Sequence, residues 1–281
     1  MISMYKYYNA SCFDSYKYID HNSIDMFFCD PPYFISGARP RNINITTGDR
    51  NDWDRQWSSK NEFYDWTLKW MLLMYDQLKP TGSAYICSSW QHSGKIMQLL
   101  KEAKFKVRNR ITWKRDKGRG SKTNWKSMHE DIWFVTKSNI YTFNVKNIMI
   151  TKKVVAPYRD ENGNPKGWSI SDNGEPVRMT YPGNLWIDFT VPFWSMKEVR
   201  SYAKTKKSPN NRHKKHNTQK PKELVKRCIL ASTNKGDTVA DYFVGSGTTL
   251  ISAIETGRNC IALDINSVCI EMLEDRLRNE L

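Results

Sequence analysis

The residues Asp30-Pro31-Pro32-Tyr33 place a carboxylate, two prolines and an aromatic ring within four positions. They directly follow residues 24–29, an apolar run with the length and composition of a buried parallel strand. Asp30 is therefore expected at the carboxyl end of a strand, where open α/β sheets bind their ligands. The prolines lack backbone N–H groups, so the carbonyls of Asp30 and Pro31 are free to accept hydrogen bonds from a ligand.

These groups suit an exocyclic amine on a planar base. The Asp30 carboxylate and the Pro31 carbonyl can accept hydrogen bonds from the amine, and the ring of Tyr33 offers a face on which the base can stack. For an isolated Asp-Pro-Pro, a simple turn after a strand is the alternative, because turn chemistry alone favours these residues. The remainder of the chain decides between the two interpretations.

A second ligand-binding pattern lies near the C-terminus. One apolar run ends in Asp241, and the glycine turn Phe243-Val244-Gly245-Ser246-Gly247 leads into a helix expected from Thr248. Another run ends in Asp264, 19 residues after Gly245, where nucleotide-binding units keep an acid for ribose hydroxyls. Leu250 stands where a dinucleotide fingerprint has its third glycine, which weakens a pyrophosphate interpretation.

Alternating strand and helix patterns must position these two sites, which predicts an α/β fold. Strands are expected over 1–8, 24–29, 83–88, 107–113, 130–136, 238–242 and 260–264. Helices are expected over 13–19, 62–78, 92–104, 222–234, 248–256 and 268–278. Residues 34–60 lack periodicity and are expected to form a long mobile loop beside the site, of the kind that often acts as a lid. Residues 139–215 have turn residues, short strand patterns and no convincing helix, which indicates an inserted recognition region rather than a separate domain.

The net charge of +15 is concentrated in two segments. Residues 101–130 carry a net +8 and residues 196–227 a net +10, so the remainder of the chain is slightly acidic. Clustered Lys and Arg are typical of proteins that neutralise phosphates, and the expected loop 114–126 adds Trp125 to its basic residues. A solvated surface is the alternative for one such run, but two runs that carry the whole excess favour a nucleic-acid partner.

Cysteine usage and hydropathy argue against a metal-binding, a disulfide-rich and a membrane protein. The six cysteines form no CxxC pair and lie mostly in apolar runs, so we expect neither a metal site nor a disulfide framework. No apolar run approaches the roughly 20 residues that span a bilayer. We therefore expect a cytoplasmic protein without a membrane partner.

The order of the motifs resembles a known family. The Asp30 motif, a basic variable region, His216-Asn217-Thr218-Gln219-Lys220-Pro221 and the glycine turn follow one another as in the beta-class, permuted amino-methyltransferases of bacterial restriction-modification systems. The resemblance covers nearly the whole chain, and residues 113–120 resemble the adenine-specific branch. Asn217 is a departure, because many relatives carry proline there.

The resemblance implies a Rossmann-like fold dependent on S-adenosylmethionine, with a mostly parallel sheet that contains an antiparallel strand and with an inserted target-recognition region. Residues 1–138 would form the catalytic half, 139–215 the target-recognition region and 216–281 the cofactor-binding half. The implied partners are double-stranded DNA with a flipped base, a second copy of the chain and a cognate restriction endonuclease.

The same resemblance assigns residues. The catalytic residues would be Asp30, Pro31, Pro32 and Tyr33. S-adenosylmethionine, the methyl donor, would contact Asp264 through its ribose. Its carboxylate would contact Thr218 and Lys220. Its further contacts would be Ser11, Cys12, Asp30, Asp241, Phe243, Gly245, Gly247 and Thr248. The basic composition of the expected loop, rather than the resemblance, indicates that DNA phosphates would contact Arg115, Lys117, Arg119, Lys122 and Lys126.

The motif itself serves both adenine N6 and cytosine N4. Asp in its first position is more frequent in adenine enzymes, whereas many cytosine-N4 enzymes of the family carry Ser, so we expect N6-adenine methylation. The alternatives are cytosine-N4 methylation, methylation of RNA or of a protein amide, and a non-catalytic nucleic-acid-binding protein on the same fold.

Overall fold

A computed structural model describes residues 3–35, 54, 56–119, 122–189 and 219–280 of the chain. Its centre is an eight-stranded sheet with the order β1-β11-β10-β2-β3-β5-β4-β9. The strands are β1 (Tyr5–Asn9), β2 (Ile24–Cys29), β3 (Leu78–Ser88), β4 (Lys106–Arg119), β5 (Ser127–Thr136), β9 (Leu185–Trp186), β10 (Thr238–Asp241) and β11 (Asn259–Asp264).

Every neighbouring pair from β1 to β3 is parallel, and β5 is antiparallel to both β3 and β4. One strand of the sheet is thus reversed, which confirms the expected mostly parallel sheet with an antiparallel strand. The C-terminal strands β10 and β11 lie between β1 and β2. The two ends of the chain therefore build one sheet, and the ends of distant segments become neighbours.

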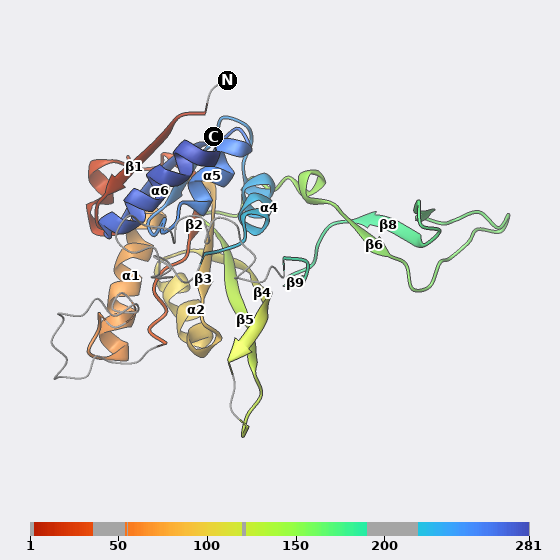
Figure 1. Ribbon diagram of the computed structural model, residues 1–281, viewed down its shortest axis with the longest axis horizontal. Coiled ribbons are helices and arrows are strands. Elements are labelled where there is room, and N and C mark those ends of the chain that lie inside the picture. Colours follow the sequence, from red (N-terminus) through yellow and green to blue (C-terminus); the bar gives the residue numbers. More distant parts are fainter. Residues whose placement is uncertain (1–2, 36–53, 55, 120–121, 190–218, 281) are drawn as a thin grey trace, which may run out of the picture.

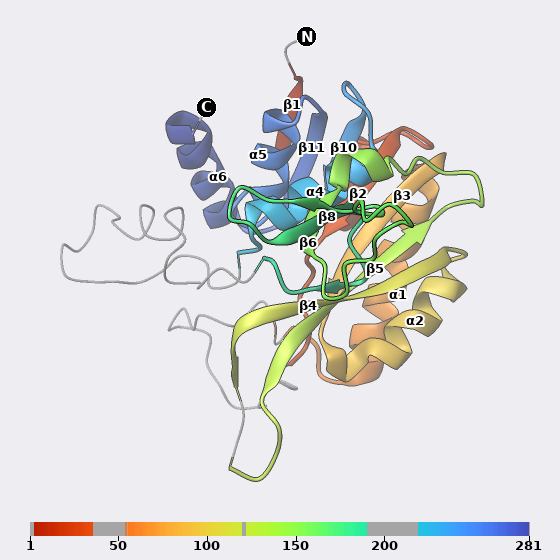
Figure 2. The same cartoon turned by 90° about the vertical axis from the view of Figure 1, so that its right-hand side faces the viewer.

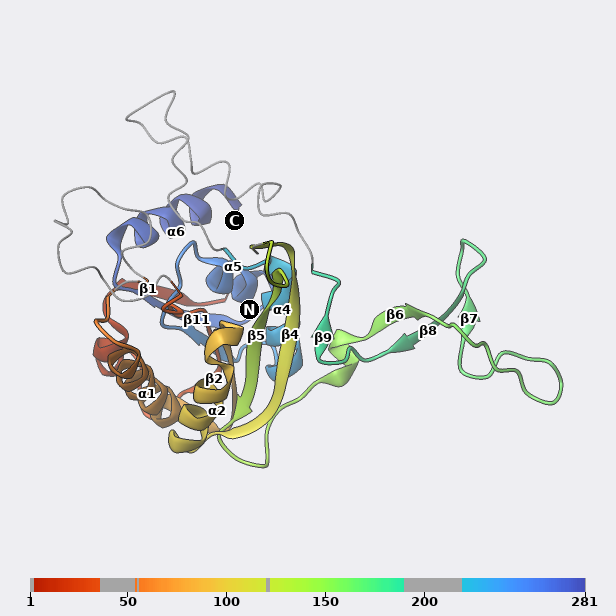
Figure 3. The same ribbon diagram turned by 90° about the horizontal axis from the view of Figure 1, so that it is seen from below.

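Helices cover both faces of the sheet (Figure 3). The helices are α1 (Lys60–Gln77), α2 (Ser93–Glu102), α4 (Lys222–Ser232), α5 (Thr248–Glu255) and α6 (Ser267–Glu280), with 3-10 turns η1 (Cys12–Lys17), η3 (Trp90–His92) and η4 (Val145–Ile148). Alternate residues of β2 face the two layers, since Met26 packs with α4 and α5 while Phe27 packs with α1 and α2. This double burial explains why β2 is a continuous apolar run.

Two elements extend beyond their predicted bounds. β3 begins at Leu78, directly after α1, and a bulge between the pairs Ile24↔Leu78 and Met26↔Ser83 accommodates Pro80. β4 continues to Arg119, so the expected loop over 114–126 is wrong for its first half. Pairing of β4 with β5 satisfies backbone groups that a loop would leave to water, and the register shifts there by several residues.

The segment 139–189 leaves the body and returns. It forms a separate three-stranded sheet from β6 (Ile150–Lys153), β8 (Pro176–Thr180) and β7 (Ser169–Ile170). This sheet projects from the body as an arm, which points toward the viewer in the turned view (Figures 1 and 2). The chain then reaches the body again at β9, which pairs with β4.

Most of the predicted lid, residues 36–53 and 55, lies outside the described residues. Its described end is packed, because Asp54 and Trp57 are buried. No helix among the described residues is long and apolar enough to cross a bilayer.

Candidate active site

Three carboxylates lie at one edge of the central sheet. Asp30 follows β2, Asp241 ends β10 and Asp264 ends β11, and these neighbouring strands are parallel. Burial, together with the nearby charges of Asp30 and Asp264, raises the pKa of Asp241 to about 7. Strand ends from the N-terminal and C-terminal parts of the chain therefore meet at this edge.

The glycine turn between β10 and α5 has a backbone that few other residues would adopt. Gly245 has a φ of 52° and Gly247 a φ of 86°. A Cβ on Gly247 would lie 2.3 Å from Cδ1 of Leu273, so the turn also packs against α6 without room for a side chain. The Gly245 amide donates to Oδ2 of Asp264 at 2.9 Å, which ties the turn to the end of β11.

Asp241 stabilises this turn through hydrogen bonds. Its carboxylate accepts hydrogen bonds from the Phe243 amide (2.9 Å) and the Thr249 hydroxyl (2.6 Å), and only 2% of the residue is exposed. The Phe243 ring packs against Trp66 and Trp70 of α1. Asp241 thus holds the turn in place, whereas Asp264 is partly exposed beside it.

A buried arginine in α6, which the sequence analysis missed, fixes the other side of the turn. Arg276 is fully buried and donates to the Ser246 carbonyl (2.8 Å) and to Oγ1 of Thr248 (3.2 Å). It also pairs with Glu280 at 2.8 Å. An arginine four residues before a glutamate in a helix is a common surface pattern, so nothing in the sequence indicated that this guanidinium is buried.

Ser11 and Cys12 lie at the carboxyl end of β1, next to β11. The Ala10 amide donates to the Asp264 carbonyl at 3.0 Å. Ser11 caps η1 by accepting from the Phe13 amide at 3.2 Å. Cys12 is buried, and burial raises the pKa of its thiol to about 12, so it serves as a core residue beside the site.

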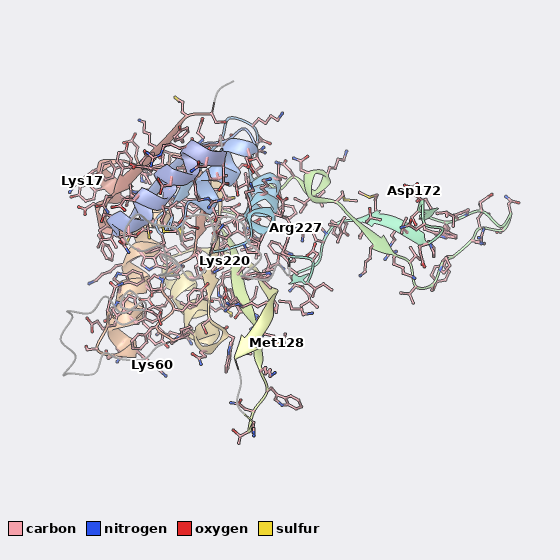
Figure 4. The ribbon with its side chains drawn as sticks, in the orientation of Figure 1. Lys17, Lys60, Met128, Asp172, Lys220 and Arg227 are labelled. Carbon is pink, nitrogen blue, oxygen red and sulfur yellow. The ribbon has the colours of Figure 1, made fainter. Side chains whose placement is uncertain are left out.

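Both oxygens of the Asp30 carboxylate have partners. The Tyr33 hydroxyl donates to Oδ1 at 2.5 Å, and the Lys220 ammonium donates to Oδ2 at 2.6 Å. Lys220 is 6% exposed and lies inside the body (Figure 4). The structure therefore places Lys220, which was expected to face the carboxylate of the methyl donor, directly on Asp30.

Glu130 of β5 completes this cluster and was missed by the sequence analysis. Its Oε2 lies 3.1 Å from Nζ of Lys220 and 3.3 Å from the Tyr33 hydroxyl, while its Oε1 pairs with Nη1 of Arg115 at 2.8 Å. The rings of Tyr33 and Trp113 flank the ammonium, with centroids 5.5 and 5.9 Å from Nζ. Two cations and two carboxylates thus balance one another, and all of them except Arg115 are largely buried.

The pKa values in the cluster reflect burial and charge. Burial alone would lower the pKa of Lys220, but Asp30 and Glu130 together raise it above its ordinary value. Burial and the same two carboxylates raise the pKa of Tyr33 well above its ordinary value. Lys220 is therefore an ammonium and Tyr33 a neutral hydrogen-bond donor at neutral pH.

The backbone after the motif is held by Asp54, which is 1% exposed. Its Oδ1 accepts from the amides of Tyr33 (2.9 Å) and Phe34 (2.5 Å). Phe34 has a φ of 53°, an uncommon conformation that these bonds and its packing on Trp57 and Phe63 maintain. The motif also borders a mostly apolar pocket lined by Pro31, Pro32, Tyr33, Phe63, Thr67, Trp70, Ile86, Cys87, Ser88, Ser89, His92 and Ile96.

The residues proposed for DNA contacts have different surroundings. Lys122 and Lys126 are exposed near the tip of the β4–β5 hairpin, close to Trp125, which is 97% exposed. Arg115 is paired with Glu130, as described above. Lys117 and Arg119 belong to β4, and Thr218 lies outside the described residues.

Comparisons with known proteins fit this geometry. A family model described as DNA methylase, N6_N4_Mtase, matches residues 24–275. The chain belongs to the DNA methylase family. The resemblance drawn from the three motifs is thereby confirmed.

Curated relatives match over nearly the whole chain. The type II methyltransferase M1.MboII of Moraxella bovis is 32% identical over 274 residues, which cover 95% of this chain and 94% of that protein. The DNA adenine methyltransferase YhdJ of Escherichia coli (strain K12) is 33% identical over 263 residues, covering 91% of this chain and 76% of that protein. These two relatives are thus named as a type II methyltransferase and a DNA adenine methyltransferase.

Solved structures share the fold. The M1.HpyAVI–SAM complex aligns with a TM-score of 0.59 at 20% identity, over 98% of this chain and 99% of that one. The cytosine-N4-specific PvuII DNA methyltransferase aligns with a TM-score of 0.65 at 14% identity, over 96% of this chain and 86% of that one. These likenesses confirm the Rossmann-like methyltransferase fold expected from the sequence.

Proposed function

We propose that this protein is a site-specific DNA methyltransferase that transfers a methyl group from S-adenosylmethionine to the N6 amine of adenine in double-stranded DNA. The observation that carries the proposal is the Asp30 carboxylate at the end of β2, next to the glycine turn that follows β10, in a chain of the DNA methylase family. The donor and the acceptor amine would meet where these two parallel strands end.

The residues around the glycine turn fit the donor. Gly245 and Gly247 let the backbone approach a ligand closely, and the partly exposed carboxylate of Asp264 suits ribose hydroxyls. Ser11 lies at the end of the strand beside Asp264, where it would contact the donor's adenine end. S-adenosylmethionine supplies an electrophilic methyl group when it is bound.

Asp30 acts on the acceptor. An exocyclic amine is a weak nucleophile because its lone pair is delocalised into the ring. The Asp30 carboxylate and the Pro31 carbonyl would accept hydrogen bonds from its two N–H groups, which favours a pyramidal nitrogen with an available lone pair. The carboxylate also stabilises the positive charge that develops on nitrogen and can accept the proton that the product amine loses.

The target base must leave the duplex to reach Asp30, which costs a few kcal/mol. Stacking on Tyr33 offsets part of this cost. Lys122 and Lys126 on the β4–β5 hairpin would contact phosphates, and the arm formed by β6, β7 and β8 would contribute to recognition of the DNA sequence. In this proposal residues 1–138 and 216–281 are the catalytic and cofactor-binding halves, and residues 139–215 are the target-recognition region.

Adenine is the proposed base because Asp occupies the first position of the motif and because a relative at 33% identity is named a DNA adenine methyltransferase. Cytosine N4 is the second candidate, because the cytosine-N4-specific PvuII enzyme has the same fold. A homodimer and a cognate restriction endonuclease are further partners in this proposal.

Nucleoside analysis tests the choice of base. Purified protein would be incubated with DNA and S-adenosylmethionine, and the DNA would be digested and examined by mass spectrometry. We expect N6-methyladenine, confined to one short sequence in the methylome of an expressing host. N4-methylcytosine alone would overturn the adenine assignment, and the absence of any methylated base would overturn the proposed activity.

A further inference from the structure

Both oxygens of the Asp30 carboxylate already accept a hydrogen bond from a side chain of the protein itself. Oδ1 accepts from the Tyr33 hydroxyl and Oδ2 from the Lys220 ammonium. A target amine that takes the position of Lys220 on Oδ2 must displace the ammonium. Lys220 is 6% exposed, and an unpaired ammonium at such a site is strongly unfavourable, so Lys220 needs another carboxylate when it leaves Asp30.

Glu130 has the position that this exchange requires. Its Oε2 is already 3.1 Å from Nζ of Lys220, so a shift of a few tenths of an ångström would convert this contact into a short ionic hydrogen bond. Arg115 holds Oε1 at 2.8 Å and thereby directs Oε2 toward Lys220. Glu130 itself is 10% exposed on its side chain and lies on β5, a central strand that does not need to move.

We propose that Glu130 is a positioning residue that retains the Lys220 ammonium when the target amine takes its place on Oδ2 of Asp30. The inference rests on the proposed function, since it assigns the step by which that site accepts its substrate. In the free protein Lys220 bridges Asp30 and Glu130. With a base in the site, Lys220 stays with Glu130, and Asp30 remains an unprotonated carboxylate that accepts a hydrogen bond from the amine.

The first test measures the rate of methyl transfer in a variant of Glu130. Glu130→Gln keeps the shape of the side chain and removes its charge, so Lys220 stays on Asp30. With saturating DNA and donor, we expect its single-turnover transfer rate to fall by about 10-fold or more. Donor affinity, thermal unfolding and the fluorescence of 2-aminopurine at the target position, which reports base extrusion, should stay near wild type. Glu130→Asp should restore part of the rate.

Arg110 provides a matched control for Arg115. Both are partly exposed residues of β4 that pair with a buried carboxylate of β5, but Arg110 pairs with Asp131 at 3.9 Å. We expect Arg115→Gln to lower the single-turnover rate less than Glu130→Gln does, and Arg110→Gln to leave it unchanged. A wild-type rate in Glu130→Gln overturns the inference. An equal loss of donor binding, base extrusion and rate also overturns it, because that pattern indicates a structural role.

The second test needs no activity and so separates this inference from the proposed function. Lysine acetylation, followed by mass spectrometry at increasing pH, measures how firmly the Lys220 proton is held, with exposed Lys122 as the reference. In Asp30→Asn, Glu130 alone should keep Lys220 protected, whereas the double variant Asp30→Asn, Glu130→Gln should label at least several-fold faster. Equal rates for the two variants would overturn the inference even if the wild-type enzyme methylates adenine.

Discussion

Asp264 and Asp30 follow two strands of the same sheet but are held in different ways. Asp264 accepts hydrogen bonds from the backbone amides of Gly245 and Asn266, both at 2.9 Å. Asp30 accepts from the side chains of Tyr33 and Lys220. A backbone amide in a packed turn has a fixed direction, whereas an ammonium or a hydroxyl can rotate to another acceptor. The proposed cofactor side around Asp264 therefore has fixed hydrogen bonds, and the proposed catalytic side around Asp30 has exchangeable ones.

Removal of Asp30 is the strongest test of this difference. Asp30→Ala should lower methyl transfer by roughly 10²–10³-fold or more, because the variant loses the acceptor for the target amine. Lys220 keeps Glu130 as a partner, so the free energy of unfolding and the donor affinity should change little. Transfer of labelled methyl groups and donor binding by calorimetry would be measured side by side. Turnover near wild type would refute the assignment of Asp30.

The opposite pattern is expected for Gly247→Ala, on the fixed side. A Cβ at this position would be 2.3 Å from Cδ1 of Leu273, in addition to the unfavourable φ of 86°. Together the strain and the steric overlap should cost about 2–4 kcal/mol of unfolding free energy and reduce donor affinity. Denaturant unfolding and donor titration would measure the two effects.

Gly163→Ala is the matched control for that variant. Gly163 has a φ of 83°, but a Cβ there would meet nothing within 4 Å. It should cost only the backbone strain, about 1–2 kcal/mol, and leave donor affinity unchanged. Equal losses in the two variants would mean that packing against Leu273 contributes nothing to the turn.

The same division separates what the sequence could predict from what it could not. The glycine turn, Asp241 and Asp264 lie within one short βαβ unit, where hydrophobic periodicity and glycine spacing are informative. The cluster around Asp30 instead joins distant positions of the chain. Glu130 lies 97 residues after Tyr33, and Lys220 lies 190 residues after Asp30. Its position on β2 was predictable, but its partners depend on which strands become neighbours.

Glu130, Asp54 and Arg276 illustrate the same limit. Glu130 resembled one acid among many basic residues, and Asp54 lay in a segment without periodicity. Their roles come from burial beside backbone amides or cations, which only the tertiary fold creates. The basic segment 114–119 was misjudged for a related reason, because pairing with β5 outweighs the loop propensity of Gly118.

A pH dependence tests the burial of Asp241. Burial raises its pKa in the folded protein to about 7, above its ordinary value, so the folded state binds the proton more tightly than the unfolded state. Its contribution to stability is then present at low pH and decreases as pH rises from about 4 to about 7. Asp241→Asn should remove this decrease, which amounts to at most about 1.4 kcal/mol per pH unit.

Unfolding in denaturant at pH 5 and pH 8 would measure that change, with Asp172→Asn on the arm as an exposed control (Figure 4). The control should follow the wild-type pH dependence. The same pH dependence in wild type and Asp241→Asn would contradict a buried, protonated carboxyl under the glycine turn.

The smallest expected effects concern DNA binding by the β4–β5 hairpin, away from both Asp30 and Asp264. Lys122 and Lys126 are exposed, whereas Arg115 is held by Glu130. Each lysine-to-alanine change should lower the slope of log affinity for DNA against log salt by roughly 0.9, the value for one lost phosphate contact. Arg115→Gln should change the slope less, because its charge is already paired within the protein. Filter-binding titrations at several salt concentrations would measure the slopes. An equal effect of all three changes would show that Arg115 leaves Glu130 when DNA binds, and that the exchangeable side of the site extends to the DNA contact itself.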